Sequence, residues 1–318
     1  MIHNEPLRLG VIGAGRWGRN LIRTALALAD EGIALTAVAT SRVAEAEAWL
    51  PSSVRLLPSW QEMLDPARTG TLHALALAVP PQAQTEIALA ALRQGIALLL
   101  EKPLALDPAA ARQVAELSAQ TGVPALVDHI FLFHPAFLRL LEEARRVGVR
   151  SIRSAGGNRG PFRPEFSPWW DWAPHDAAMI LSVMNDAPLA FTRHRPPPAP
   201  APPGEPSGEV FRLDLAFSDQ RTATMTVGNG MTEKNRWFEA TLSDGSLWRF
   251  DDRAPHRLTR RWKNVEEPIP TAETPPLAEA LRALARAARG QAVPLEQGAA
   301  FAARVVELLA TAEAQTPD

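Results

Sequence analysis

The chain of 318 residues is long enough for two domains of ordinary size, and its 46% hydrophobic content is sufficient to fill two cores. Its formal net charge of −2 gives no electrostatic reason to expect nucleic acid or an anionic membrane as a partner. The absence of cysteine excludes disulfides, thiolate metal sites and cysteine nucleophiles, and the absence of tyrosine excludes Tyr-x-x-x-Lys redox chemistry.

The N-terminal segment MIHNEP lacks the basic stretch and apolar run of a signal peptide. No later stretch reaches the roughly 18 consecutive apolar residues of a membrane span. We therefore expect a cytoplasmic protein without a membrane partner.

The first predicted strand leads into a glycine-rich turn. Leu7–Ile12 is a short apolar run that ends at a glycine, and Arg16–Ala29 then has apolar residues at helical spacing. Strand, turn and helix are the context that the dinucleotide fingerprint GxGxxG requires. In this fingerprint Gly13 permits the tight turn, Gly15 lets the backbone approach a pyrophosphate, and Gly18 lets the helix pack closely on the strand. A glycine turn that binds no ligand is the alternative.

Strand and helix patterns continue to alternate after this loop. Four further runs are apolar enough to be buried on both faces: Ile33–Ala39, Val54–Leu57, Leu72–Val79 and Ile96–Leu100. Helical patterns lie between most of them, notably at Pro81–Gln94 and Pro108–Thr121. This alternation predicts a parallel, doubly wound α/β domain of the Rossmann type, which we place at residues 1–122.

The end of the second predicted strand bears on the choice of cofactor. It falls near Thr40, 22 residues after Gly18, where NAD-binding proteins usually carry an acidic residue for the ribose 2′-hydroxyl. No carboxylate stands there, and Ser41 and Arg42 are suited to bind a 2′-phosphate instead. The sequence therefore favours NADP over NAD. The alternative is that Arg42 is only a solvated residue at a helix start.

The pattern changes from about Val123. A further strand (123–133) and a helix (Pro135–Arg146) are followed by alternating apolar and polar segments, with a hairpin turn at Ser243–Ser246. The alternating segments are Arg150–Gly157, Phe211–Phe217, Ala223–Val227 and the hairpin Trp237–Phe250. We predict a second, α+β domain at residues 123–318, with a predominantly antiparallel, open-faced sheet beside the carboxyl ends of the first domain's strands.

A proline-rich stretch and two helical patterns lie in the rest of the chain. The proline-rich stretch 195–209 predicts an exposed, extended loop, with a proline motif for another protein as the alternative. Pro276–Arg289 and Leu295–Ala314 predict two alanine-rich helices that could pack on either domain. Because an uncovered apolar sheet face would need a partner, we expect a homodimer or homotetramer.

Two segments carry candidate catalytic residues. Glu101-Lys102-Pro103 places one of only three lysines at the carboxyl end of a central strand, near any bound nicotinamide. In WWDWAPHDAAMI (169–180), Asp171 precedes His175 by four residues, and Pro174 is suited to begin a helix. Asp171 could then orient the histidine, although a histidine near a helix start is often structural. The neighbouring tryptophans could face a sugar ring, but we expect at least two of the three to be core or interface residues.

Four motifs together resemble one known family: GAGRWGRN (13–20), EKP (101–103), DHIFLFHPA (128–136) and WDWAPHD (170–176). They resemble the glucose-fructose oxidoreductase / inositol dehydrogenase, or Gfo/Idh/MocA, family, and they span nearly the whole chain in the family's order. The resemblance implies a Rossmann domain joined to an open-faced antiparallel sheet and NAD or NADP as cofactor. It also implies oxidation or reduction at carbinol centres of sugars, cyclitols and nucleotide sugars.

The resemblance assigns the family's lysine to Lys102 and its Asp-x-x-x-His element to Asp171 and His175. The chain departs from the family at Gln84, Leu132 and Ala173, where histidine, arginine and glycine are frequent, so no particular sugar is inferred. We predict that His175 is the acid or base, that Lys102 stabilises the alkoxide, and that no metal takes part. The alternatives are a non-catalytic nucleotide-binding regulator and a reductase of an imine or tetrapyrrole. The cofactor contacts expected are Gly13, Gly15, Arg16, Trp17, Gly18, Thr40, Ser41, Arg42, Val79, Pro80, Glu101 and Lys102.

Overall fold

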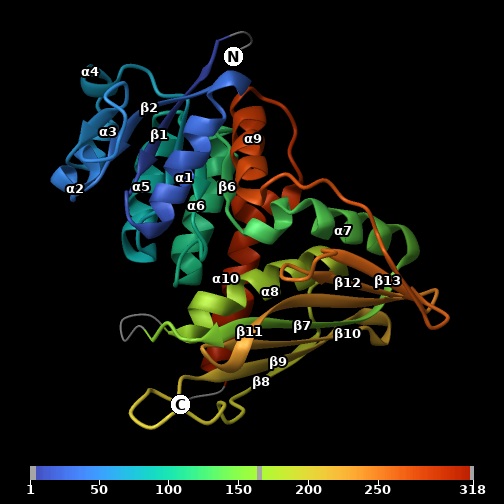
Figure 1. Cartoon of the computed structure of the whole chain (residues 1–318). Helices are drawn as coiled ribbons and strands as arrows, with labels where there is room; N and C mark the ends of the chain where they lie inside the picture. Colours follow the sequence, from blue (N-terminus) through green and yellow to red (C-terminus); the bar gives the residue numbers. More distant parts are fainter. Residues whose placement is uncertain (1–4, 163–166, 316–318) are drawn as a thin grey trace. The chain divides into compact units, whose positions relative to one another are not determined.

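The computed structural model describes residues 5–162 and 167–315, so the first four residues of MIHNEP lie outside it. The chain divides into two compact units, coloured along the sequence in Figure 1. Unit 1 comprises Met1–Ile130 and Pro275–Val306, and unit 2 comprises Phe131–Thr274 and Glu307–Asp318. The predicted boundary at 122/123 differs from this division, because the sixth strand and much of the C-terminal helical region belong to unit 1.

Unit 1 is built on a six-stranded parallel sheet in the order β3-β2-β1-β4-β5-β6. Each predicted strand of the first domain is present, and the order reverses direction between β1 and β4. Open α/β sheets bind ligands at such a reversal point, beside the carboxyl ends of the strands. The strands are β1 (Leu7–Ile12), β2 (Ile33–Ala39), β3 (Arg55–Leu57), β4 (Ala74–Leu77), β5 (Ala97–Leu100) and β6 (Ala125–Val127).

Helices on both faces explain the unbroken apolar sequence of the central strands, since every residue of β4 and β5 is buried. The helix α6 shows how local signals set the boundaries: the Asp107 side chain accepts a hydrogen bond from the Ala110 amide at 2.8 Å, and Gly122 ends the helix at φ +68°. The helices are α1 (Arg16–Ala27), α2 (Val43–Glu47), α3 (Trp60–Met63), α4 (Pro66–Thr69), α5 (Pro81–Arg93), α6 (Pro108–Thr121) and α9 (Pro276–Ala288).

The C-terminal region returns to unit 1 through α9, which packs on β5, β4 and α1. The Arg282 guanidinium binds the Glu31 carboxylate with two hydrogen bonds of 2.6 and 2.7 Å and so ties α9 to the segment before β2. The single helix predicted over Leu295–Ala314 is interrupted at Gly298. A short 3₁₀ turn (Leu295–Gln297) precedes α10 (Ala299–Ala314), whose residues are shared by the two units.

Unit 2 contains an eight-stranded sheet in the order β14-β13-β12-β11-β7-β10-β9-β8. All neighbouring pairs are antiparallel except β10 and β7, which run parallel. With the parallel sheet of unit 1, this arrangement confirms the predicted fold class. The strands are β7 (Val149–Arg159), β8 (Ala190–His194), β9 (Val210–Ala216), β10 (Thr222–Gly228), β11 (Gly230–Leu242), β12 (Leu247–Asp251), β13 (Leu258–Trp262) and β14 (Val265–Pro268).

Two helices cover one face of this sheet. The helix α8 (Pro168–Met184) packs on β7 and β10, while α7 (Pro135–Val147) packs on β11, β12 and β13. The proline-rich segment 195–209 forms no helix or strand and is mostly exposed, which confirms the predicted loop between β8 and β9. No helix within the described ranges is long and apolar enough to span a membrane.

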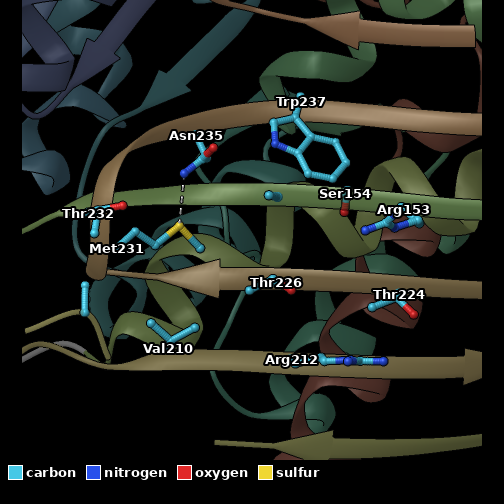
Figure 2. A pocket seen from close by; sticks show the side chains of 13 residues that line it. Arg153, Ser154, Val210, Arg212, Thr224, Thr226, Met231, Thr232, Asn235 and Trp237 are labelled. Carbon is cyan, nitrogen blue, oxygen red and sulfur yellow. Dashed lines mark hydrogen bonds between the residues drawn. The ribbon is translucent and has the colours of Figure 1, made fainter. Parts of the chain in front are cut away.

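The opposite face of the sheet is polar, which corrects the expected apolar face. Strand alternation sends Ala223, Met225 and Val227 into the core and the threonines between them outward. This face carries a hollow of about 650 Å³, lined by side chains that include Arg153, Arg212, Thr224, Thr226 and Trp237. Figure 2 shows how these side chains lie on the strands. The argument for a homo-oligomer from apolar exposure therefore fails. Oligomeric state stays a prediction, to be measured by light scattering.

Candidate functional site

The glycine loop between β1 and α1 is fixed by steric limits at two of its three glycines. Gly13 adopts φ +98°, and a Cβ there would lie 2.2 Å from the carbonyl oxygen of Ala78. A Cβ at Gly18 would lie 1.9 Å from the carbonyl oxygen of Gly13, so the helix could not pack where it does. Close packing against these two carbonyl oxygens therefore explains why Gly13 and Gly18 must be glycine.

The third glycine faces a different environment. A Cβ at Gly15 would meet only the guanidinium end of Arg42, at 3.1 Å, and no backbone atom within 4 Å. The first turn of α1 has no acidic residue, so its free amides and positive dipole end are not neutralised from within the helix. Backbone access and exposed amides together fit a pyrophosphate.

The other predicted contacts of the loop lie around this opening. Arg16 and Trp17 are exposed in the first turn of α1, with Trp17 38% accessible. The Val79 Cγ1 atom lies 3.4 Å from the Cβ position of Gly13, and Pro80 is the residue before α5. The ends of β1 and β4 therefore bring these four residues to one edge of the sheet.

The segment after β2 presents a cation beside the glycine loop. The Thr40 hydroxyl accepts a hydrogen bond from the Arg42 amide at 3.2 Å, and Ser41 is exposed. The Arg42 side chain is 58% exposed and lies 3.6 Å from Glu45, whose carboxylate also binds Arg19. An exposed pair of this length contributes little stability, so the guanidinium is available to a ligand.

Gln84 fixes the loop that carries Lys102. It lies in the first turn of α5, is 1% exposed, and its Oε1 accepts a hydrogen bond from the Glu101 amide at 2.9 Å. Its Nε2 lies within donating distance of the carbonyl oxygens of Glu101, Pro103 and Leu104, at 2.8, 3.2 and 3.1 Å. From the resemblance, Gln84 stands where the family frequently has a histidine, and we expected this position to bear on substrate contacts. The structure instead shows a buried side chain bound to the backbone of the lysine loop.

Two buried carboxyl groups lie at the ends of the neighbouring strands β5 and β6. Leu100 pairs with Val127, so Glu101 and Asp128 directly follow a paired position, and the Asp128 amide donates to the Leu100 carbonyl at 2.7 Å. Asp128 is 3% exposed, and neither of its carboxyl oxygens has a hydrogen-bond partner among the described residues. The Glu101 Oε2 accepts from the Lys102 amide at 3.2 Å, whereas its buried Oε1 has no such partner there.

Burial dominates the electrostatics of this cluster. It raises the pKa of Asp128 to about 7, against the opposing charge of Lys102. Burial, and then repulsion from Asp128, raises the pKa of Glu101 well above its ordinary value. Burial, helped by the Lys102 charge, lowers the pKa of His129 to about 3, so this histidine is neutral at physiological pH. In the sequence, Asp128 and His129 belong to the motif DHIFLFHPA, and neither was predicted to be a site residue.

In unit 2, α8 carries the other candidate catalytic residues. The helix begins at Pro168, where the Ser167 hydroxyl accepts from the Trp169 amide at 3.2 Å, and Pro174 lies inside it. The prediction that Pro174 begins a helix was therefore wrong, because another proline and a serine cap precede it. Asp171 and His175 are one turn apart on the same side of α8.

A buried ion pair adjoins His175 and was missed by sequence reasoning. Asp176 is fully buried, and Arg236 from β11 donates to its Oδ2 at 3.1 Å. The Arg236 guanidinium lies 5.1 Å and 5.2 Å from the ring centroids of Phe131 and Trp172, and Phe131 packs edge-on against His175 at 5.4 Å. Burial raises the pKa of Asp176 and lowers that of Arg236, while each partner's charge opposes the shift.

A usable signal for this pair was present in β11. The strand places Phe238 and Ala240 in the core by alternation, and Arg236 falls on the same inward side. A charged residue at a core position needs a buried partner.

The tryptophans of α8 have packing roles in two cases, as expected. Trp169 is fully buried and its indole donates to the Leu309 carbonyl at 3.3 Å. The Trp170 indole donates to the Glu313 carboxylate at 2.8 Å. Trp172 is the exception, since it is partly exposed and lies against Arg236.

The predicted site residues thus form two sets. The glycine loop, Arg42 and Lys102 belong to unit 1, whereas Asp171 and His175 belong to unit 2. Convergence of Lys102 and His175 on one substrate stays a prediction. Within the described ranges, no group of three or more histidine, aspartate or glutamate residues is arranged to hold a metal ion.

Comparisons with known proteins place these features in a family. Residues 7–129 match the family GFO_IDH_MocA, described as an oxidoreductase family with an NAD-binding Rossmann fold. A protein from Magnetospirillum magnetotacticum MS-1 that is assigned to the oxidoreductases is 33% identical, with a TM-score of 0.85, over 97% of this chain and 100% of its own. No curated protein matches the chain.

Two further solved structures share the fold at lower identity. UDP-N-acetylglucosamine 3-dehydrogenase from Acidithiobacillus ferrooxidans is 20% identical, with a TM-score of 0.78 and 96% of both chains covered. GenD2 from gentamicin A biosynthesis, crystallised with NAD, is 22% identical, with a TM-score of 0.77 over 98% of this chain and 94% of its own.

Proposed function

The chain belongs to the NAD-binding GFO_IDH_MocA oxidoreductase family, and on that premise we propose that it is an NAD(P)-dependent dehydrogenase or reductase. The proposed reaction moves a hydride between nicotinamide and a CH–OH or carbonyl carbon of a sugar, cyclitol or nucleotide sugar. The observation that carries the proposal is the arrangement at one sheet edge. There the open glycine loop follows β1, and the fixed Lys102 loop follows β5, two strands away.

The proposed cofactor supplies or accepts the hydride, and the chain supplies binding and proton transfer. Gly13, Gly15 and Gly18 would hold the pyrophosphate at the start of α1, as their geometry fits. Lys102 would donate a hydrogen bond to the substrate oxygen and so stabilise a developing alkoxide. His175 would take up or deliver the hydroxyl proton, because the ordinary pKa of histidine lies near neutrality.

The substrate class is supported by the named dehydrogenase that shares the fold, which acts on a nucleotide sugar. The test is a thermal-shift screen of the full chain with NADP, NAD and a panel of sugars, cyclitols and nucleotide sugars, followed by turnover assays on the stabilising compounds. Stabilisation by a nicotinamide cofactor with turnover of one such compound is the expected result. Cofactor binding without turnover of any panel member would favour a regulator or a reductase of another substrate.

We further propose that NADP(H) binds more tightly than NAD(H), because Arg42 stands beside the glycine loop and no carboxylate occupies the end of β2. Replacing Arg42 with Ala is expected to weaken NADP(H) binding about 10- to 100-fold, the scale of a charge-assisted hydrogen bond, and to leave NAD(H) binding nearly unchanged. Calorimetric titration of both cofactors measures the effect. The matched control is Arg23→Ala, an exposed arginine of α1. Equal affinities of the unsubstituted chain for the two cofactors would overturn the preference.

A further inference from the structure

The buried carboxyl group of Asp128 has no role in the mechanism described so far, yet it lies beside the lysine loop. We propose that Asp128 is a positioning residue for Lys102, which balances the charge of the lysine and keeps it protonated for hydrogen bonding to the substrate oxygen. The catalytic consequence rests on the proposed function. The state of Lys102 itself can be measured without substrate or cofactor.

Strand pairing brings Asp128 close to the Lys102 loop. Parallel pairing of β5 with β6 brings the Glu101 and Asp128 positions to the same edge of the sheet, next to Lys102. Gln84 holds the backbone between Glu101 and Leu104 by hydrogen bonds, so the loop has little freedom to move away from Asp128. Asp128 therefore follows the strand next to a fixed loop.

The Asp128 carboxyl group is buried without hydrogen bonds to the described part of the chain. Neither carboxyl oxygen of Asp128 has a hydrogen-bond partner among the described residues, although the group is almost completely buried. A buried ionised carboxylate without hydrogen bonds is strongly unfavourable unless a cation is near, and a buried neutral carboxyl group keeps its proton. Asp128 must therefore hold a proton or face a positive charge.

The cation nearest to this carboxyl group in its electrostatic effect is Lys102. Lys102 is the positively charged group whose field acts on both Glu101 and Asp128. His129 adjoins Asp128 but is held neutral by burial, and Gln84 on α5 carries no charge. Burial raises the pKa of both carboxyl groups, and that of Asp128 lies at about 7, so Asp128 changes its charge in the neutral range. Its carboxylate then favours the ammonium form of Lys102.

The scarcity of lysine makes a direct experiment practical. The chain has only Lys102, Lys234 and Lys263, so labelling with [13Cε]lysine gives three NMR signals, assigned through Lys234→Arg and Lys263→Arg. In the unsubstituted chain we expect the Lys102 signal to show two inflections with pH, one from its own titration and one in the neutral range from Asp128. In Asp128→Asn the neutral inflection of the Lys102 signal disappears. The other two lysines serve as internal controls.

A matched variant separates the two carboxyl groups. Glu101→Gln keeps a neutral inflection in the Lys102 signal if Asp128 is its source, and loses it if Glu101 is. An unchanged Lys102 titration in a folded Asp128→Asn variant would overturn the proposal. If that variant does not fold, the pH titration of the unsubstituted chain still tests the proposal. A Lys102 signal without an inflection in the neutral range would contradict the proposal by itself.

The functional consequence is tested separately. With an accepted substrate, Asp128→Asn should lower kcat, leave the KM for the nicotinamide cofactor nearly unchanged, and move the pH profile of turnover toward acid. A purely structural role would alter stability without moving that profile. If no turnover is found with any substrate, the proposed function fails while the NMR result for Lys102 stands.

Discussion

Replacing Lys102 with Ala, or His175 with Ala, is expected to slow hydride transfer by about 10²–10⁴-fold, the usual scale for loss of a general acid, base or alkoxide-stabilising group. The reason is that each side chain is proposed to contact the substrate oxygen. Asp171→Asn should cost less, since Asp171 would act through the histidine. Folding of both variants, and the cofactor affinity of His175→Ala, should stay close to those of the unsubstituted chain, because neither side chain is needed to form the glycine loop.

Single-turnover hydride transfer measures this effect, with a thermal melt and a cofactor titration for each variant. The matched control is Lys234→Ala, which removes an exposed lysine of β11 and should leave the rate unchanged. Rates near those of the unsubstituted chain in both alanine variants would show that Lys102 and His175 are structural. That outcome would favour a nucleotide-binding regulator of the same fold.

The parts of unit 1 that sequence predicted well are those decided by local physics. Leu7–Ile12, Ile33–Ala39 and Pro108–Thr121 have the predicted bounds, because apolar spacing, a side-chain cap and a glycine stop act over a few residues. The glycine loop belongs to the same class. Its positive φ at Gly13 and its close packing at Gly18 follow from a short strand–turn–helix connection.

Features that depend on distant partners were harder to predict. Gln84 looked like a departure from a family pattern, and only the folded chain shows that its amide binds a loop seventeen to twenty residues later. The start of α8 was misplaced because Pro168 and Pro174 are both compatible with a first turn, and the choice depends on the Ser167 cap. The second sheet has a polar outer face because its alternating strands send their apolar residues to the helix-covered face and their polar residues outward.

Asp128, Asp176 and Arg236 illustrate the same limit within the candidate site. Asp128 and Asp176 are charged residue types in largely apolar stretches, and Arg236 falls on the inward side of an alternating strand. Both patterns are local signs of a buried polar group. In the pair of Asp176 and Arg236 each partner comes from another element, and the two residues are 60 positions apart. Sequence can therefore indicate that such a residue needs a partner, whereas the partner itself depends on strand order and helix packing.

Replacing Arg236 with Met is expected to lower the free energy of unfolding by about 3–5 kcal/mol, because it leaves the fully buried Asp176 carboxylate without its counter-ion. Urea unfolding measures the change. The control is Arg260→Met, which breaks the exposed 2.6 Å pair with Glu267 and should cost less than about 1 kcal/mol. Equal losses in the two variants would show that the Asp176–Arg236 pair adds no more stability than a surface pair.

The pH dependence of this loss distinguishes an unpaired charge from lost packing. Burial already raises the pKa of Asp176 in the folded chain, and removing Arg236 removes the main opposing charge, so that pKa rises further. A group with a raised folded pKa binds its proton more tightly when folded, so it favours the folded state at low pH. This contribution is lost as pH rises from the unfolded value, near 4, through the folded pKa. The Arg236→Met variant should therefore lose more stability at pH 8 than at pH 5.

A second change, Asp176→Leu, should recover much of the loss and abolish its pH dependence, because an apolar pair needs no counter-ion. A loss that is equal at both pH values and unchanged by Asp176→Leu would mean that Arg236 stabilises unit 2 through its contacts with Phe131 and Trp172 alone.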